Sequence, residues 1–305
     1  MKIAYLFSGQ GSQFAQMGQD LYQSEPVYKQ TVDEASDVLD LNFKDAKVFD
    51  DPKNVQTAIV TMSTGLFRLL NKELPVSVGA CGLSLGEYSA LISAVAIDFA
   101  PALKLVNDRS HYMAEAGQEH PGKMAAVLKA NPQVLGDAIQ AASKVGTVVP
   151  ANFNTDEQVV IGGFKQGVDA ASKYLKSHGA NIVIPLKVAV ASHTPLMQSA
   201  SDQLSKRLQS VTFKQPEFPV ISNTTSQEFE LNDIKQILTE QLIKPTHFEN
   251  CVRKLFALGA DTFIELGPGK TLTKLAMKNL KGKKVNFYHV DSSESLNKLR
   301  EELGD

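Results

Sequence analysis

Short apolar runs alternate with longer stretches of mixed polar and apolar residues through the first 120 positions of the chain. Residues 1–8 form an apolar run that leads into a glycine turn, which is typical of a strand. Residues 76–81 are a second short run of small and apolar residues, and residues 87–96 and 101–116 have the composition of helices. Strands that alternate with helices predict a parallel sheet covered by helices.

The pattern changes near Gly122, where shorter elements follow one another closely. Helices are predicted over 132–143, with proline in the first turn, and over 165–178, which ends before a glycine. Strands are predicted over 124–128, 147–153, 158–161 and 181–186. The resulting order, βαββαβ, is that of the ferredoxin-like motif. We therefore predict a small domain over 122–190, inserted into a larger α/β domain made of 1–121 and 191–305.

Composition narrows the class of protein. The chain has 305 residues, 43% hydrophobic and 21% charged, with a net charge of −2 and an isoelectric point of about 6.3. This balance does not favour binding to nucleic acid or to a membrane surface. Cys81 and Cys251 form neither a disulfide framework nor a metal-ligand spacing, and no apolar run is long enough to span a bilayer. We expect a cytoplasmic protein.

The most informative short motif is Gly82-Leu83-Ser84-Leu85-Gly86, a Gly-x-Ser-x-Gly pattern. It lies between a predicted strand and a predicted helix, as a nucleophile elbow requires. In such a turn the glycines leave room for close backbone approach, and the serine hydroxyl is exposed near the helix N-terminus. The pattern is short enough to arise by chance, so the flanking elements decide in favour of Ser84 as a nucleophile.

A serine nucleophile needs a base, and the chain offers six histidines. His193 follows a strand-like stretch and directly precedes Thr194-Pro195, where a helix is predicted to begin. Since ligands of α/β sheets gather at the carboxyl ends of strands, His193 is predicted to share an edge with Ser84. The alternative is a histidine at a helix start with no catalytic role.

Two further features could complete an active site. The turn Gln10-Gly11-Ser12-Gln13 follows the first strand, and its N–H groups could join that of Leu85 in an oxyanion hole. The same turn could equally be an ordinary glycine turn. Arg109 lies on a predicted helix, where most arginines are solvated. Neither glycine-rich turn of the chain completes a nucleotide-binding fingerprint, because Phe14 and Ile264 occupy positions that require glycine.

Taken together, these residues resemble one family, the malonyl-CoA:acyl-carrier-protein transacylases of bacterial fatty-acid synthesis. The resemblance covers essentially the whole chain and includes the inserted ferredoxin-like domain. Each matching motif is weak alone, but the ordered set is specific. The motifs, in chain order, are Phe7-Ser8-Gly9-Gln10-Gly11-Ser12-Gln13, Gly82-Leu83-Ser84-Leu85-Gly86-Glu87-Tyr88, Arg109, Ala151-Asn152-Phe153-Asn154, Ser192-His193 and Glu265-Leu266-Gly267-Pro268-Gly269.

The resemblance implies a hydrolase-like large domain and a ping-pong reaction. Ser84 would accept the malonyl group from malonyl-CoA as an ester and pass it to the phosphopantetheine thiol of acyl carrier protein. His193 would act as base and acid, with backbone carbonyls rather than an aspartate orienting it. The N–H groups of Gln10 and Leu85 would hold the oxyanion, and Arg109 would bind the free carboxylate of malonate.

The resemblance implies no cofactor and no metal beyond the two substrates. The partners would be the coenzyme A thioester and, transiently, acyl carrier protein, with no nucleic acid and no membrane. Three related or rival functions stay open at this stage: an esterase or thioesterase that uses the same elbow, an acyltransferase that serves a polyketide synthase or a malonate decarboxylase, and a catalytically silent scaffold.

Three positions depart from the family's usual residues. Leu83 replaces the histidine that usually precedes the nucleophile, which removes a polar neighbour and could alter acyl selectivity. His247 stands where glutamine or arginine is more usual, in a region whose main chain orients the catalytic histidine. His247 is therefore a candidate orienting residue and a rival base. Gln56 lies in a weakened family motif and is a candidate for the acyl pocket.

Lys270, Lys274, Lys278 and Lys281 recur at near-helical spacing after the Gly-Pro-Gly turn. Such a series is typical of a solvated helix face. The alternative is a docking surface for an acidic carrier protein, whose approach it would steer electrostatically.

Overall fold

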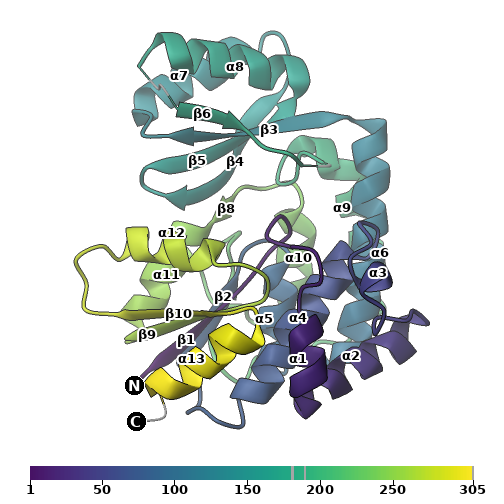
Figure 1. Ribbon diagram of the computed structural model, residues 1–305. Coiled ribbons are helices and arrows are strands. Elements are labelled where there is room, and N and C mark those ends of the chain that lie inside the picture. The colour runs from purple at the N-terminus through teal and green to yellow at the C-terminus, as the bar shows by residue number, and fades with distance from the viewer. Residues whose placement is uncertain (180–181, 189, 304–305) are drawn as a thin grey trace. The chain divides into compact units, whose positions relative to one another are not determined.

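The computed structural model of the protein describes residues 1–179, 182–188 and 190–303 (Figure 1). The chain forms two compact units. The first unit comprises Met1–Asp108, Val211–Ile234 and Asn250–Asp305, and the second comprises Arg109–Ser210 and Lys235–Glu249. Helix α6 (Phe99–Glu119) crosses the boundary between them in the sequence.

The first unit is built on a five-stranded parallel sheet with the strand order β10-β9-β1-β2-β7. The strands are β1 (Ile3–Phe7), β2 (Gly79–Gly82), β7 (Val220–Ile221), β9 (Thr262–Leu266) and β10 (Asn286–Val290). Phe7 pairs with Gly82 on one side and with Leu266 on the other. Three strands therefore end level with one another, and the loops that follow them share one edge of the sheet.

Helices pack around this sheet, and every residue of β1 is buried, as expected for a central parallel strand. The helices are α1 (Gln19–Ser24), α2 (Pro26–Leu39), α3 (Ala46–Phe49), α4 (Val55–Leu70), α5 (Gly86–Ser93), α11 (Phe248–Ala257), α12 (Thr271–Asn279) and α13 (Ser293–Leu303). Helix α4 is buried at every position except Arg68, and α5 packs on β1 and β2. The alternation of strands and helices predicted for the first 120 residues is confirmed.

The second unit contains a five-stranded sheet with the order β6-β3-β5-β4-β8. Its strands are β3 (Gly122–Leu128), β4 (Val148–Thr155), β5 (Gln158–Phe164), β6 (Ile182–Pro185) and β8 (Thr246–His247). Helices α7 (Pro132–Ala142) and α8 (Lys165–Ser177) lie together on one face, where Leu135, Ile161, Val168 and Leu175 form part of a common core (Figure 1). The first four strands are antiparallel, and this confirms the predicted ferredoxin-like motif.

Three further elements belong to this unit or border it: the short 3-10 helix η1 (Pro195–Met197), α9 (Gln198–Leu208) and α10 (Ile234–Gln241). The second unit is thus larger than the predicted inserted domain, since it adds segments on both sides of 122–190 and a distant one that supplies β8. The domain boundaries themselves stay a prediction. Asn181, which begins the last predicted strand, and residues 304–305 of the predicted large domain lie outside the described residues.

Candidate active site

Ser84 lies in a tight turn between β2 and α5. Its φ angle is 54°, in the left-handed region that non-glycine residues adopt at a cost of about 1–3 kcal/mol. A Cβ atom at Gly82 would collide with the backbone of Gly86, and one at Gly86 would collide with the carbonyl of Phe7. The two glycines therefore allow the close approach that the turn needs. This is the backbone geometry expected of a nucleophile elbow.

A buried carboxylate fastens the elbow to the neighbouring strand end. The N–H of Asn223, just after β7, donates to Glu87 Oε1 at 2.5 Å, and Asn223 Nδ2 donates to the carbonyl of Gly82 at 2.9 Å. Glu87 and Asn223 are both fully buried. The sequence pattern did not single out Asn223, because it lies 139 positions after Ser84 and belongs to no local motif.

The loop after β1 lies beside the elbow, since the N–H of Leu83 donates to the carbonyl of Phe7 at 3.3 Å. Gln10 is exposed in that loop, and its Oε1 accepts a hydrogen bond of 3.2 Å from Nε2 of the buried Gln56. Among the hydrogen bonds of the described residues, none uses the backbone N–H of Gln10 or of Leu85. Both N–H groups can thus serve an anionic oxygen. Leu85 precedes the first residue of α5, where the helix dipole also favours negative charge.

His193 is buried in the second unit, and the end of α10 fixes its ring. His193 Nδ1 lies 2.7 Å from the carbonyl oxygen of Gln241, and its backbone N–H donates to the carbonyl of Leu242 at 2.9 Å. The carbonyls of the last helical turn have no partners within the helix, so they are available to such donors. Because a carbonyl only accepts, Nδ1 carries the proton and Nε2 keeps its lone pair. Nε2 can therefore act as a base.

Burial lowers the pKa of His193 to about 4, and the positive charge of Arg109 acts in the same direction. Hydrogen bonds to the backbone at Gln241 and Lys244 act against this shift. The imidazole is consequently neutral at pH 7, the state that a general base requires.

Arg109 lies within α6 and is only 1% exposed. One edge of its guanidinium is fixed by a hydrogen bond from Nη2 to Gln241 Oε1 at 3.1 Å. A planar cation held in a buried position is suited to bidentate binding of a carboxylate. Gln241 thus contacts both Arg109 and His193, and the sequence pattern did not identify it.

His247 lies on β8 with its ring stacked on Phe153, at a centroid distance of 4.8 Å and an interplanar angle of 5°. Its Nδ1 is 3.4 Å from Glu249 Oε1. The hydrogen bond to His193 Nδ1 comes from Gln241, six residues earlier in the chain. The orienting role predicted for His247 stays a prediction, and its contacts describe a stacked, partly exposed ring.

The predicted site residues divide between the two units. The first unit holds the nucleophile and the oxyanion donors, namely Ser84, Leu85 and Gln10, together with Gln56. The second holds His193, Arg109 and His247. Each half is organised by contacts within its own unit.

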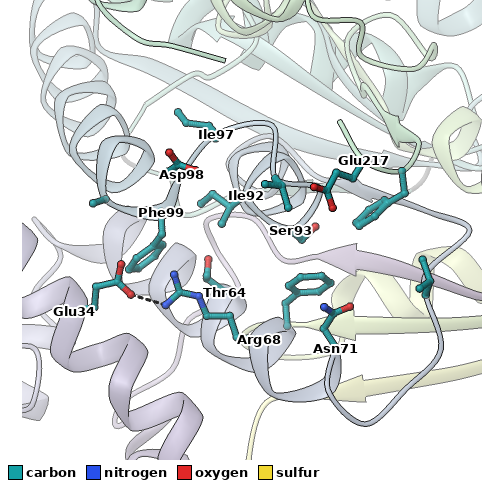
Figure 2. Close-up of a pocket in the computed structure, with 15 residues that line it drawn as sticks. Glu34, Thr64, Arg68, Asn71, Ile92, Ser93, Ile97, Asp98, Phe99 and Glu217 are labelled. Carbon is teal, nitrogen blue, oxygen red and sulfur yellow. Dashed lines mark hydrogen bonds and ion pairs between the residues drawn. The ribbon is translucent and has the colours of Figure 1, made fainter. Parts of the chain in front are cut away.

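A separate cavity of about 530 Å³ lies in the first unit, away from the elbow (Figure 2). It is lined by Arg68 near the end of α4 and by Ser93 at the end of α5, the opposite end of that helix from Ser84. Figure 2 shows the Arg68 guanidinium directed toward Glu34, with which it forms an ion pair of 2.6 Å. The same guanidinium lies 4.8 Å from the ring centre of Phe99. This cavity holds none of the predicted site residues.

Within the described residues, no cluster of three or more His, Cys, Asp or Glu side chains could hold a metal ion. In that part of the chain no helix has the length and apolar character needed to cross a membrane. Cys81 and Cys251 are both buried, and they are not joined in a disulfide.

Comparison with known proteins identifies the family. Residues 4–304 match the model of the acyl transferase domain. A malonyl CoA-acyl carrier protein transacylase of Bacillus subtilis is 39% identical over 285 residues, which cover 91% of this chain and 90% of that protein. The crystal structure of MCAT from Streptococcus pneumoniae matches with a TM-score of 0.93 and 38% identity, over 99% of this chain and all of that one.

A third similar structure is a malonyl-transacylase in complex with a type II polyketide synthase acyl-carrier protein. It has a TM-score of 0.92 and 32% identity, and the match covers 99% of this chain and all of that one. The family match and the similarity over nearly the full length agree with the elbow, the ferredoxin-like sheet and the motif order described above. The chain belongs to the acyl transferase family, among the malonyl-CoA:acyl-carrier-protein transacylases.

Proposed function

We propose that this protein transfers the malonyl group from malonyl-CoA to the phosphopantetheine thiol of acyl carrier protein through a malonyl ester on Ser84. The observation that carries the proposal is a strained elbow serine in a chain that also holds a buried, neutral histidine whose Nδ1 is fixed by a backbone carbonyl. The printed names of the relatives, malonyl CoA-acyl carrier protein transacylases, supply the substrates.

In the first half-reaction, the Ser84 hydroxyl attacks the thioester carbonyl carbon while His193 Nε2 takes its proton. The N–H groups of Gln10 and Leu85 stabilise the resulting oxyanion. When the C–S bond breaks, His193 returns the proton to the departing coenzyme A thiolate. In the second half-reaction the carrier thiol gives its proton to His193 Nε2, and its sulfur attacks the ester carbonyl carbon. The ester C–O bond then breaks, and His193 returns the proton to Ser84 Oγ. Both steps require Ser84 and His193 to lie side by side during turnover, which is part of the proposal.

Arg109 gives the reaction its preference for malonyl over acetyl groups. Its guanidinium binds the free carboxylate of malonate, whereas an acetyl group has no carboxylate to pair with this cation. A buried charge that loses its partner costs several times more than an ordinary hydrogen bond. Position 83 holds an apolar leucine where the family usually has a histidine. The strictness of the preference for malonyl is therefore part of the experiment below.

The experiment is intact-mass analysis after brief exposure to malonyl-CoA, acetyl-CoA or methylmalonyl-CoA, with Ser84→Ala as the control. The expected result is one malonyl adduct, absent in Ser84→Ala and removed by holo acyl carrier protein. If malonyl-CoA leaves no adduct on the wild-type protein, or if Ser84→Ala still acquires one, the proposed mechanism is wrong. Release of free malonate without any carrier would instead identify a thioesterase.

The similarity to the polyketide synthase complex supports a second candidate, in which the carrier protein belongs to a polyketide synthase. The chemistry is the same, so only the carrier distinguishes the two. Comparison of malonyl transfer to a fatty-acid carrier and to a polyketide carrier decides between them.

The proposal also includes a reaction without metal or organic cofactor, in the cytoplasm. Serine and histidine suffice for acyl transfer between an oxygen and a sulfur, since no electrons are exchanged. Activity that survives dialysis against a chelator would agree with this part of the proposal.

A further inference from the structure

Gln241 is the last residue of α10, is fully buried, and contacts two candidate active-site residues through different groups. Its backbone carbonyl accepts from His193 Nδ1 at 2.7 Å, and its side-chain Oε1 accepts from Arg109 Nη2 at 3.1 Å. Because a guanidinium has only donors, the amide atom that faces Arg109 must be the oxygen. Gln241 therefore positions both the imidazole ring of His193 and the guanidinium of Arg109.

The backbone carbonyl of Gln241 accepts a hydrogen bond from His193 Nδ1, which is the role of the aspartate in a catalytic triad. The end of a helix carries a partial negative charge of about half an elementary charge, and Gln241 is at that end. Its carbonyl fixes the tautomer of His193 and stabilises the imidazolium that forms during proton transfer. This contact would survive a change of side chain at position 241.

The side-chain contact has a different consequence. An amide oxygen orients the guanidinium but brings no charge of its own. A carboxylate at the same place would form an ion pair with Arg109 and so compete with an acidic substrate. Glutamine is thus suited to a site in which the cation must stay available for the ligand.

We propose that Gln241 is a positioning residue that determines specificity for acyl groups with a free carboxylate, by holding Arg109 in a fixed orientation relative to His193. This inference rests on the proposed function, because Arg109 is taken to bind the malonyl carboxylate.

The test compares acylation by malonyl-CoA and by acetyl-CoA in Gln241→Glu and Gln241→Met. In Gln241→Glu the KM for malonyl-CoA should rise about tenfold or more, because the new carboxylate neutralises Arg109. Acetyl loading should change much less, so the ratio of malonyl to acetyl loading should fall about tenfold. Gln241→Met should lower kcat/KM for malonyl-CoA about tenfold, because the Arg109 guanidinium loses a hydrogen-bond acceptor. The loss of a hydrogen bond to a charged group typically changes an equilibrium constant about tenfold or more.

The matched control is Gln236→Met, which makes the same substitution at an exposed position of the same helix. It should leave both substrates unaffected. In an Arg109→Ala background, neither Gln241 variant should change the ratio of malonyl to acetyl loading any further. A merely structural role would lower both reactions together and would persist in that background, and either result would overturn the inference. Gln241→Glu has nearly the shape of the native side chain, so it answers the question even if Gln241→Met does not fold.

A second readout needs no substrate. The charge of Arg109 contributes to the low pKa of His193, so neutralising it in Gln241→Glu should raise that pKa, as followed by NMR of the imidazole. An unchanged pKa would contradict the inference. Failure of the wild-type protein to load malonyl would instead reject the proposed function, and the titration would still report on the contact between Gln241 and Arg109.

Discussion

His193 acquires its properties from the groups packed around it. Its Nδ1 bond to the Gln241 carbonyl sets the tautomer, while burial and the nearby Arg109 charge lower the pKa to about 4. A histidine with this pKa is entirely neutral at pH 7 and is a weaker base than one near 6.5. The arrangement keeps the base in its active protonation state across the physiological range, at some cost in proton affinity.

The low pKa of His193 predicts the pH dependence of acylation. Protonation inactivates the base, so kcat/KM for malonyl-CoA should fall on acidification with an apparent pKa near 4 rather than 6.5. In Arg109→Ala, followed with acetyl-CoA, the acid limb should move to higher pH, since a charge that disfavours the imidazolium is gone. Acylation rates measured by quenching the reaction at set times, between pH 4 and 8, give the acid limb of the wild type and that of Arg109→Ala. An acid limb near 6.5 in the wild type would mean that His193 is solvated in the working enzyme.

The lowered pKa of His193 also makes the free energy of unfolding depend on pH. The folded-state pKa of His193 lies below its unfolded value, so the unfolded chain binds the extra proton between about pH 4 and 6.5. The contribution of His193 to the free energy of unfolding is therefore complete above pH 6.5 and declines as the pH falls toward 4.

Some residues of the candidate site can be identified from the sequence, whereas others become visible only in the structure. Ser84 and its glycines could be identified from the sequence because an elbow is local and each requirement falls on a particular residue type. Gln241 could not, because one of its two contacts uses a backbone carbonyl, which any residue supplies. Asn223 was likewise missed, since its bonds to Glu87 and Gly82 depend on strand order rather than on neighbours in the chain.

At the scale of elements, the alternating pattern predicted the strands and helices well, and the differences concern their ends. The helix expected over 165–178 is α8 (Lys165–Ser177), with His178 as its cap, and the strand expected over 158–161 continues to Phe164. Helix α4 is buried at every position except Arg68, so the helical spacing of Thr57, Thr61 and Thr64 does not mark an exposed face. Strand β8 has two residues and carries no sequence signal of its own.

The elbow as an element predicts how a small substitution at Gly82 behaves. Gly82→Ala places a Cβ against the backbone of Gly86, so the turn must open and Ser84 must shift. We expect a loss of about 1–3 kcal/mol in the free energy of unfolding, as for other overpacked sites, and a large loss of acylation. Chemical denaturation and intact-mass loading measure the two effects.

The matched control is Gly136→Ala, within helix α7, where a new Cβ meets no atom within 4 Å. Alanine favours a helix over glycine by about 1 kcal/mol, so this variant should gain stability and keep its activity. Equal behaviour of the two variants would contradict the requirement for close backbone approach at Gly82.

At the scale of the whole molecule, the sequence indicated a discontinuous chain path but not the composition of the two units. Residues 235–249 return to the ferredoxin-like unit after a segment of the other unit, and they bring Gln241 and β8 with them. Such a return depends on long-range packing, which periodicity does not record. The pairing of Ser84 with His193 is predicted from the position of His193 after a strand-like stretch and from the family resemblance, and it stays part of the proposal.

Charge is distributed unevenly along the chain. Residues 266–290 contain six lysines and no Asp or Glu, although the whole chain has 33 acidic and 31 basic residues. All six lysines are exposed, namely Lys270, Lys274, Lys278, Lys281, Lys283 and Lys284. Among the described residues, no ion pair involves any of them. The rest of the chain is therefore net acidic, and this segment stands out as a basic surface.

The basic segment is firmly attached at the edge of the sheet that carries Gln10. Glu265 accepts from the N–H groups of Leu272 and Thr273 at the start of α12, at 3.0 and 2.7 Å, and from Ser8 Oγ at 3.2 Å. The hydroxyl of Ser12 also lies 3.4 Å from that of Thr271. An acidic partner that approaches α12 would thus reach the loop beside the elbow, which favours the docking interpretation over a merely solvated helix face.

Reversing the charge at Lys274 and Lys278 tests this interpretation. The double variant Lys274→Glu/Lys278→Glu should raise the KM for acyl carrier protein several-fold at low salt and leave the KM for malonyl-CoA unchanged, since steering acts on the encounter with the charged partner. The difference should shrink as ionic strength rises, because exposed charges are screened over about 10 Å at 0.1 M salt. Lys104→Glu, an exposed lysine on α6, is the control for overall charge. An unchanged KM for the carrier, or an equal rise in the control, would identify the lysines of α12 as a solvated face.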